Sequence, residues 1–109
     1  MVAAVLSLAS SDARPATLSP SQAAQHVGQN AAVKGIVAEI GHSRSGVMFL
    51  DFGAPYPDAE FTAVIFSDDV SRFPGIEQAE GKTATVTGTI QLYHGRPEII
   101  LQSRSQLTF

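Results

Sequence analysis

The chain has 109 residues, of which 44% are apolar and 16% are charged, enough for one globular domain with a small core and too little for two. It contains no cysteine, so disulfides, thiolate metal sites and a cysteine nucleophile are excluded. Its formal net charge of −3 argues against a general nucleic-acid coat protein, whose affinity comes mainly from clustered Lys and Arg.

The first sixteen residues, MVAAVLSLASSDARPA, differ in character from the rest of the chain. A short apolar run from Val2 to Leu8 is followed by small residues, as at the end of an export signal. No Lys or Arg precedes the run, so a signal remnant and a plain flexible tail are both open for residues 1–16. We expect a periplasmic or secreted protein in the first case and a cytoplasmic one otherwise. The run is too short to span a membrane.

A short helix is expected at the start of the domain, which we assign to residues 17–109. Ser19 can cap this helix, Pro20 suits its first position, and Gly28 can end it.

The next three elements are expected to be strands. From residue 31 the apolar residues alternate with a period of two, which predicts a strand at 31–41 with Gly35 inside it. A glycine within a strand marks a bend or the close approach of another segment. Two further strands are expected at 47–53 and 60–66, and the two prolines between them predict a loop.

The second half of the domain is expected to begin with a helical connector at residues 67–81. Acidic residues suit its first turn, and Pro74 must interrupt or end it. Strands are then expected at 82–92 and 97–102, joined by a turn at 93–97 that contains a glycine.

Five short strands with a helical segment between the third and the fourth follow the order of an OB-fold. We therefore predict an all-β fold, a five-stranded antiparallel OB-fold barrel with a short N-terminal helix and a helical connector between strands 3 and 4. Glycines within the first and fourth strands, Gly35 and Gly88, fit a sheet that must curl sharply. A five-strand sandwich is the competing architecture, but it would not call for a helix at that point.

Several short motifs occur in the order of that fold: Val33-x-Gly35-x-Val37, Phe49-Leu50-Asp51-Phe52-Gly53, Pro55-Tyr56-Pro57, Phe61-Thr62-Ala63-Val64-Ile65-Phe66, Gly81-Lys82, Val86-Thr87-Gly88-x-Ile90 and Tyr93-x-Gly95-x-Pro97-x-Ile99. With these motifs the segment from Leu18 to Leu107 resembles the OB-fold nucleic-acid-binding domains of the anticodon-binding type, especially the small exported bacterial proteins that consist of little else. The resemblance implies the fold more strongly than the function, because one fold hosts many activities.

Two loops are candidates for a binding site. OB-folds bind ligands between the loops that join strands 1 to 2 and strands 4 to 5. Here those loops read GHSRSG at 41–46 and YHGRP at 93–97, each with a His-x-Arg pair. Arginine binds phosphate or carboxylate and stacks on bases, and aromatic rings stack on the bases of single strands. The candidate nucleic-acid-binding residues are therefore Lys34, His42, Arg44, Phe49, Tyr93, His94 and Arg96. The alternative is that both pairs are solvated residues of ordinary turns.

Neither catalysis nor a cofactor is expected. The three histidines lack the spacing of metal ligands, so no metal site is predicted. No nucleophile elbow or phosphate-cradling glycine loop occurs. Asp51 and Asp58 are not expected to form an acid/base pair, because Asp58 lies in the proline-bounded loop.

We expect a non-catalytic module that binds single-stranded nucleic acid or a related phosphate-bearing polymer. The alternative is an envelope domain that binds a protein or peptide partner through a barrel face or a strand edge. A continuous positive groove that joins Lys34, Arg44 and Arg96 would favour the first function. An interrupted one would favour the second.

Overall fold

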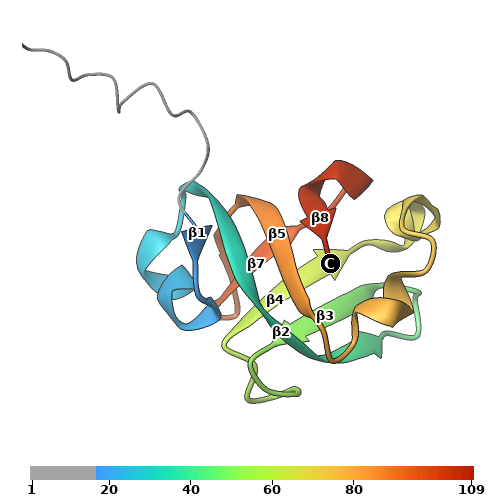
Figure 1. The fold of residues 1–109 in the computed structure, drawn as a ribbon, viewed down its shortest axis with the longest axis horizontal. Coiled ribbons are helices and arrows are strands. Elements are labelled where there is room, and N and C mark those ends of the chain that lie inside the picture. Colours follow the sequence, from blue (N-terminus) through green and yellow to red (C-terminus); the bar gives the residue numbers. More distant parts are fainter. Residues whose placement is uncertain (1–16) are drawn as a thin grey trace, which may run out of the picture.

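Strands dominate the structure, as the period of two in the sequence predicts (Figure 1). The computed structural model describes residues 17–109, so the prediction for residues 1–16 lies outside the described part. The strands are β1 (Thr17–Leu18), β2 (Asn30–His42), β3 (Met48–Phe52), β4 (Phe61–Ile65), β5 (Thr83–Thr89), β6 (Gln91–Tyr93), β7 (Arg96–Ile100) and β8 (Leu107–Thr108). The helical elements are 3₁₀ helices: η2 (Pro20–His26), η3 (Ser67–Arg72), η4 (Ile76–Ala79) and η5 (Arg104–Gln106).

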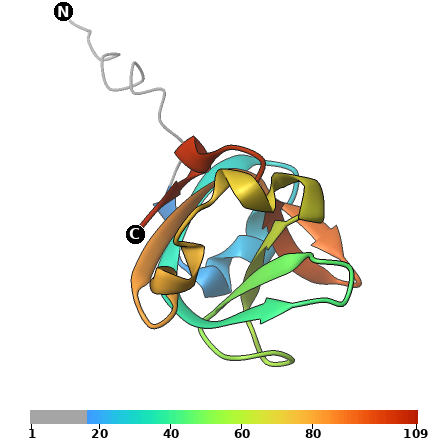
Figure 2. The same ribbon diagram turned by 90° about the vertical axis from the view of Figure 1, so that its right-hand side faces the viewer.

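All eight described strands belong to one strongly curled sheet (Figure 2). Its order is β6-β7-β4-β3-β2-β5-β8, and β1 pairs with β2 outside this path. β3 is antiparallel to both β2 and β4, as expected for the first three predicted strands. The expectation of five strands, all antiparallel, is wrong, because eight strands form and β4 runs parallel to β7. A long connection separates β4 from β7, so the chain can return to the sheet in the same direction.

The strand predicted at 82–92 is divided at Ile90. The Ile90 N–H donates to the Gln29 carbonyl at 3.0 Å, and its own carbonyl accepts from the Gly28 N–H at 2.7 Å. These bonds tie residue 90 to the loop between η2 and β2, and β6 then continues beside β7. Hydrogen-bonded ladders do not close the sheet on itself, so a closed barrel stays a prediction.

The core lies on the inner face of the curled sheet. Alternate residues of β3, Met48, Leu50 and Phe52, are at most 2% exposed and point into it. Phe52 lies opposite Phe61 of β4, and their rings meet edge to face with centroids 5.4 Å apart. Inward positions of β2, β5 and β7 complete this core.

The predicted N-terminal helix is present as the 3₁₀ helix η2, which packs against β2, β4 and β7. The Ser19 N–H donates to the Gln22 side chain at 2.9 Å, which satisfies one of the free donors at the start of the helix. Gly35 allows the close approach that its place in a strand indicates, because a Cβ there would lie 2.5 Å from Pro20 Cγ.

The helical connector between β4 and β5 is also present, as the two short 3₁₀ helices η3 and η4. Pro74 separates them, and Gly75 adopts the left-handed conformation with φ of 75°. Phe73 and Ile76 are buried and anchor the connector to the core. No helix among residues 17–109 is long and apolar enough to cross a membrane.

Candidate functional site

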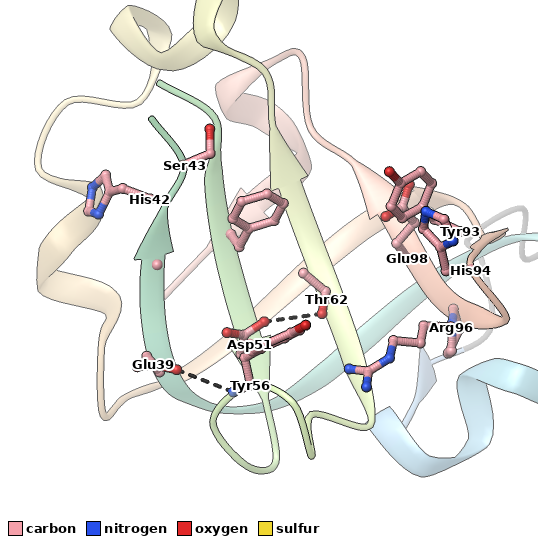
Figure 3. A pocket seen from close by; sticks show the side chains of 13 residues that line it. Glu39, His42, Ser43, Asp51, Tyr56, Thr62, Tyr93, His94, Arg96 and Glu98 are labelled. Carbon is pink, nitrogen blue, oxygen red and sulfur yellow. Dashed lines mark hydrogen bonds between the residues drawn. The ribbon is translucent and has the colours of Figure 1, made fainter. Parts of the chain in front are cut away.

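A groove of about 660 Å³ lies on the outer face of the sheet, between the β2–β3 turn and the β6–β7 hairpin (Figure 3). Its volume is within the range of about 300–1,000 Å³ that is usual for ligand sites. The lining residues are Glu39, Gly41, His42, Ser43, Phe49, Asp51, Tyr56, Thr62, Tyr93, His94, Arg96, Pro97 and Glu98.

Five of the seven predicted binding residues line this groove: His42, Phe49, Tyr93, His94 and Arg96. The two loops with His-x-Arg pairs therefore meet across one groove. Arg44 lies exposed in the β2–β3 turn, beside Ser43, and does not line the groove. Lys34 is exposed on β2 opposite Thr85 of β5, and it does not line the groove either.

The β6–β7 hairpin places Tyr93, His94 and Arg96 at one end of the groove. Tyr93 pairs with Arg96 across a two-residue turn in which both His94 and Gly95 have positive φ, 52° and 76°. Such turns favour Asn or Gly at the first position, and a histidine there is less usual. The ring centroids of His94 and Tyr93 lie 4.1 Å apart, and the two rings meet edge to face. The turn thus presents two rings side by side to the solvent.

Tyr56 forms another wall of the groove, and it was not among the seven predicted residues. It is 72% exposed, in the loop between β3 and β4. The Arg96 guanidinium carbon lies 5.4 Å from the centroid of its ring, within the range of a cation–π contact. Among residues 17–109 Arg96 has no hydrogen bond or ion pair from its side chain, so its N–H groups are free to bind a ligand.

A row of polar side chains runs across five neighbouring strands, and all of its members except Gln91 line the groove. The ladder pairs place Glu39 opposite Asp51, Asp51 opposite Thr62, Thr62 opposite Glu98, and Glu98 opposite Gln91. The Thr62 hydroxyl donates to Asp51 Oδ1 at 3.2 Å, and the Gln91 amide donates to Glu98 Oε2 at 3.1 Å. We call these five residues the polar row. None of its three acids was among the seven predicted binding residues, because no local motif reveals which residues of distant strands face each other.

A β-bulge directs Glu39 into the groove. The register between β2 and β3 shifts between Val37 and Glu39. Strict alternation from Val37 would place Glu39 on the core face, but after the bulge Ile40 packs against the core instead. Bulges often turn a side chain toward a functional site. In this groove, Glu39 Oε1 accepts a hydrogen bond from the Tyr56 N–H at 3.2 Å (Figure 3).

Burial raises the pKa of Asp51 above its ordinary value of 3.8. Its side chain is only 4% exposed, and loss of water disfavours the charged carboxylate. The neighbouring charge of Glu39 acts in the same direction, whereas the Thr62 hydrogen bond and the Arg96 charge lower the pKa. The free protein therefore holds a carboxylate where its charge is unfavourable.

This raised pKa predicts that Asp51→Asn stabilises the fold at neutral pH. A carboxyl whose pKa is higher in the folded state destabilises the fold above that pKa. This loss of stability shrinks as the pH falls below the pKa that Asp51 has in the folded state. It vanishes below 3.8, the pKa of the group in the unfolded chain. We expect the variant to exceed the parent in free energy of unfolding near neutral pH, and the difference to narrow toward about pH 4. Urea unfolding across this range checks it, with Asp58→Asn as a control at an exposed site. A difference that does not depend on pH would contradict the prediction.

The charge of the groove is negative. Arg96 is its one permanent cation, against the carboxylates of Glu39, Asp51 and Glu98. With neutral histidines the lining residues sum to a formal charge of −2. No group of three His, Asp or Glu residues within 17–109 is arranged to hold a metal ion.

No protein-family model matches the chain, and no curated protein matches it. Its function is therefore inferred from the groove.

Proposed function

We propose that this chain is a non-catalytic binding module of the OB type, whose ligand lies in the groove between the β2–β3 turn and the β6–β7 hairpin. The order of β2, β3 and β4 followed by a helical connector supports this type of fold. The connection between β5 and β6 supports it too. Only Ile90 separates these two strands in the chain, although β6 is at one end of the strand order and β5 is near the other end. The expected closed barrel is retained as part of this proposal, with eight strands in place of five.

We propose a protein or peptide segment as the ligand, because the groove is negatively charged. Of the three cations expected to form a continuous positive groove, only Arg96 lines it, and three carboxylates lie beside it. Nonspecific binding of nucleic acid depends on cations that neutralise phosphates, and this groove offers one. A peptide carries no such repeated negative charge. Exposed rings such as Tyr56 and Tyr93 are side chains that protein interfaces favour.

Single-stranded nucleic acid is the second candidate, and the exposed rings favour it. Tyr56, Phe49, Tyr93 and His94 all line the groove, and such rings stack on unpaired bases. Arg96, held over Tyr56, could bind one phosphate. In this case affinity would come from stacking and depend little on salt.

A paired titration separates the two candidates. A short labelled basic peptide and a short labelled oligothymidylate would be titrated with the full chain at low salt and followed by fluorescence anisotropy. We expect the peptide to bind at least about tenfold more tightly, since the groove repels polyanions. We also expect Tyr93→Ala to weaken peptide binding, and Lys34→Ala, outside the groove, to leave it unchanged.

The salt dependence of oligonucleotide binding is a separate readout. Binding in the groove neutralises one phosphate, so the log–log slope should be about −0.7. Tighter binding of the oligonucleotide than of the peptide, with a slope of about −2 or steeper, would mean that several cations bind phosphates. That result would overturn the peptide proposal.

Export of the protein stays a prediction that rests on residues 1–16.

A further inference from the structure

We infer that the groove recognises an arginine side chain of its bound segment, with the guanidinium seated over the polar row. This inference rests on the proposed function and names the chemistry of the partner. It is carried by charge complementarity between the polar row and the ligand, and by the flat aromatic walls around that row.

The acids of the polar row lack a cation. Within residues 17–109 the only ion pair joins Arg72 to Asp69, so neither Asp51 nor Glu98 is paired. Both acids are nonetheless buried, with 4% and 9% exposure. Buried carboxylates are normally paired with a cation or bound to a metal, because loss of water is costly for them. Here Thr62 and Gln91 supply only neutral hydrogen bonds.

The arrangement of these acids suits a planar cation with several donors. Thr62 separates Asp51 from Glu98 along the row, so the two carboxylates are about two strand spacings, roughly 10 Å, apart at the backbone. A guanidinium over Thr62 carries N–H groups on both edges, and it can donate to Asp51 from one edge and to Glu98 from the other. A lysine ammonium is a compact point charge and reaches one carboxylate at a time.

The aromatic residues around the row favour the same ligand. Tyr56 and Tyr93 are 72% and 61% exposed, and both line the groove together with Phe49. Guanidinium groups stack on aromatic faces, and Arg96 already does so on Tyr56. Figure 3 shows Asp51 and Thr62 between Glu39 on one side and Tyr93 and Glu98 on the other.

Arg96 does not supply the missing cation itself. Its guanidinium lies over Tyr56 and forms no ion pair with any acid of the groove. Its free N–H groups can instead bind a carbonyl or carboxylate of the same segment. The groove volume of about 660 Å³ has room for an arginine and parts of its neighbours.

The test compares three short blocked peptides that differ only in a central arginine, lysine or citrulline. Citrulline keeps the shape of arginine without its charge. Each peptide would be titrated into the ¹⁵N-labelled full chain while the backbone amides of Asp51, Thr62 and Glu98 are followed by NMR. We expect the arginine peptide to bind at least about tenfold more tightly than the citrulline peptide, with lysine between them.

Charge-removing variants locate the effect. Asp51→Asn and Glu98→Gln should each reduce the preference for arginine over citrulline several-fold. Glu77→Gln, an exposed change on η4 with the same loss of charge, should retain it. The spectra of the free variants report whether each is folded.

The outcomes separate the inference from the proposed function. If the three peptides bind in the groove with equal affinity, the arginine inference is wrong and a peptide groove remains. Unchanged arginine preference in both Asp51→Asn and Glu98→Gln would also overturn it. If no peptide shifts the groove amides while oligothymidylate does, the proposed function fails and the inference fails with it.

Discussion

Replacing Phe52 by alanine should lower the free energy of unfolding by about 3–5 kcal/mol, the usual loss for a fully buried phenylalanine. Phe52 has no exposed surface, and its ring meets that of Phe61 edge to face. Removing the ring leaves a cavity that the sheet cannot collapse to fill, because the backbones around it are held by ladder hydrogen bonds. Urea unfolding monitored by circular dichroism measures the loss.

Phe66→Ala provides the matched control for this substitution. Phe66 follows β4 and is 45% exposed, so the same change in side chain removes little buried surface there. Its cost should be much smaller, within about 0.5–1 kcal/mol. Equal losses for the two variants would show that Phe52 does not belong to a well-packed core.

Substitution of Gly35 by alanine should cost about 1–3 kcal/mol, although it adds a single methyl group. The new Cβ would lie 2.5 Å from Pro20 Cγ and 2.9 Å from Pro20 Cδ. The proline ring is rigid, so the helix η2 must move away from β2. Because η2 also packs against β4 and β7, this movement disturbs contacts at one end of the core. The midpoint of thermal unfolding is the readout.

Two further variants give this prediction its specificity. Gly41→Ala lies in the same strand, where a Cβ would have no neighbour within 4 Å, so we expect little change in stability. Pro20→Ala removes the atoms that collide with the new methyl group. In that background Gly35→Ala should cost less, and the difference measures the contact as in a double-mutant cycle. Equal costs for Gly35→Ala with and without Pro20 would contradict the close-approach explanation.

The sequence places most elements correctly because alternation is a local property. Residues such as Leu50 and Phe52 share a face of one strand, so their burial follows from a period of two. Pro74 and Gly75 mark the interruption of the helical connector in the same local way. The division of the fourth predicted strand at Ile90 does not follow from its composition, since it depends on hydrogen bonds to Gly28 and Gln29.

Five of the thirteen residues that line the candidate site could be found by the same means. The two loops with His-x-Arg pairs are recognisable as glycine-containing turns, and the structure brings His42 and Arg96 to one groove. The sequence by itself predicted more positive charge in the groove than the structure places there, because only Arg96 of the three expected cations lines it. Lys34 and Arg44 are near the groove residues in the chain but lie outside the groove. Lys34 belongs to the part of β2 that pairs with β5, whereas the groove borders the part that pairs with β3, and Arg44 lies in the exposed turn.

By itself the sequence determined the strand-rich composition, the order of the elements, the helical connector and the turns that border the groove. These follow from side-chain periodicity and from the backbone limits of proline and glycine, which act over a few residues. Only the tertiary structure decided the polar row and the sign of the groove's charge. The bulge before Glu39 and the parallel pairing of β4 with β7 bring Glu39, Asp51 and Glu98 into one row. Register between distant strands is set by packing of the whole core, and a one-residue slip would turn each of these acids to the other face.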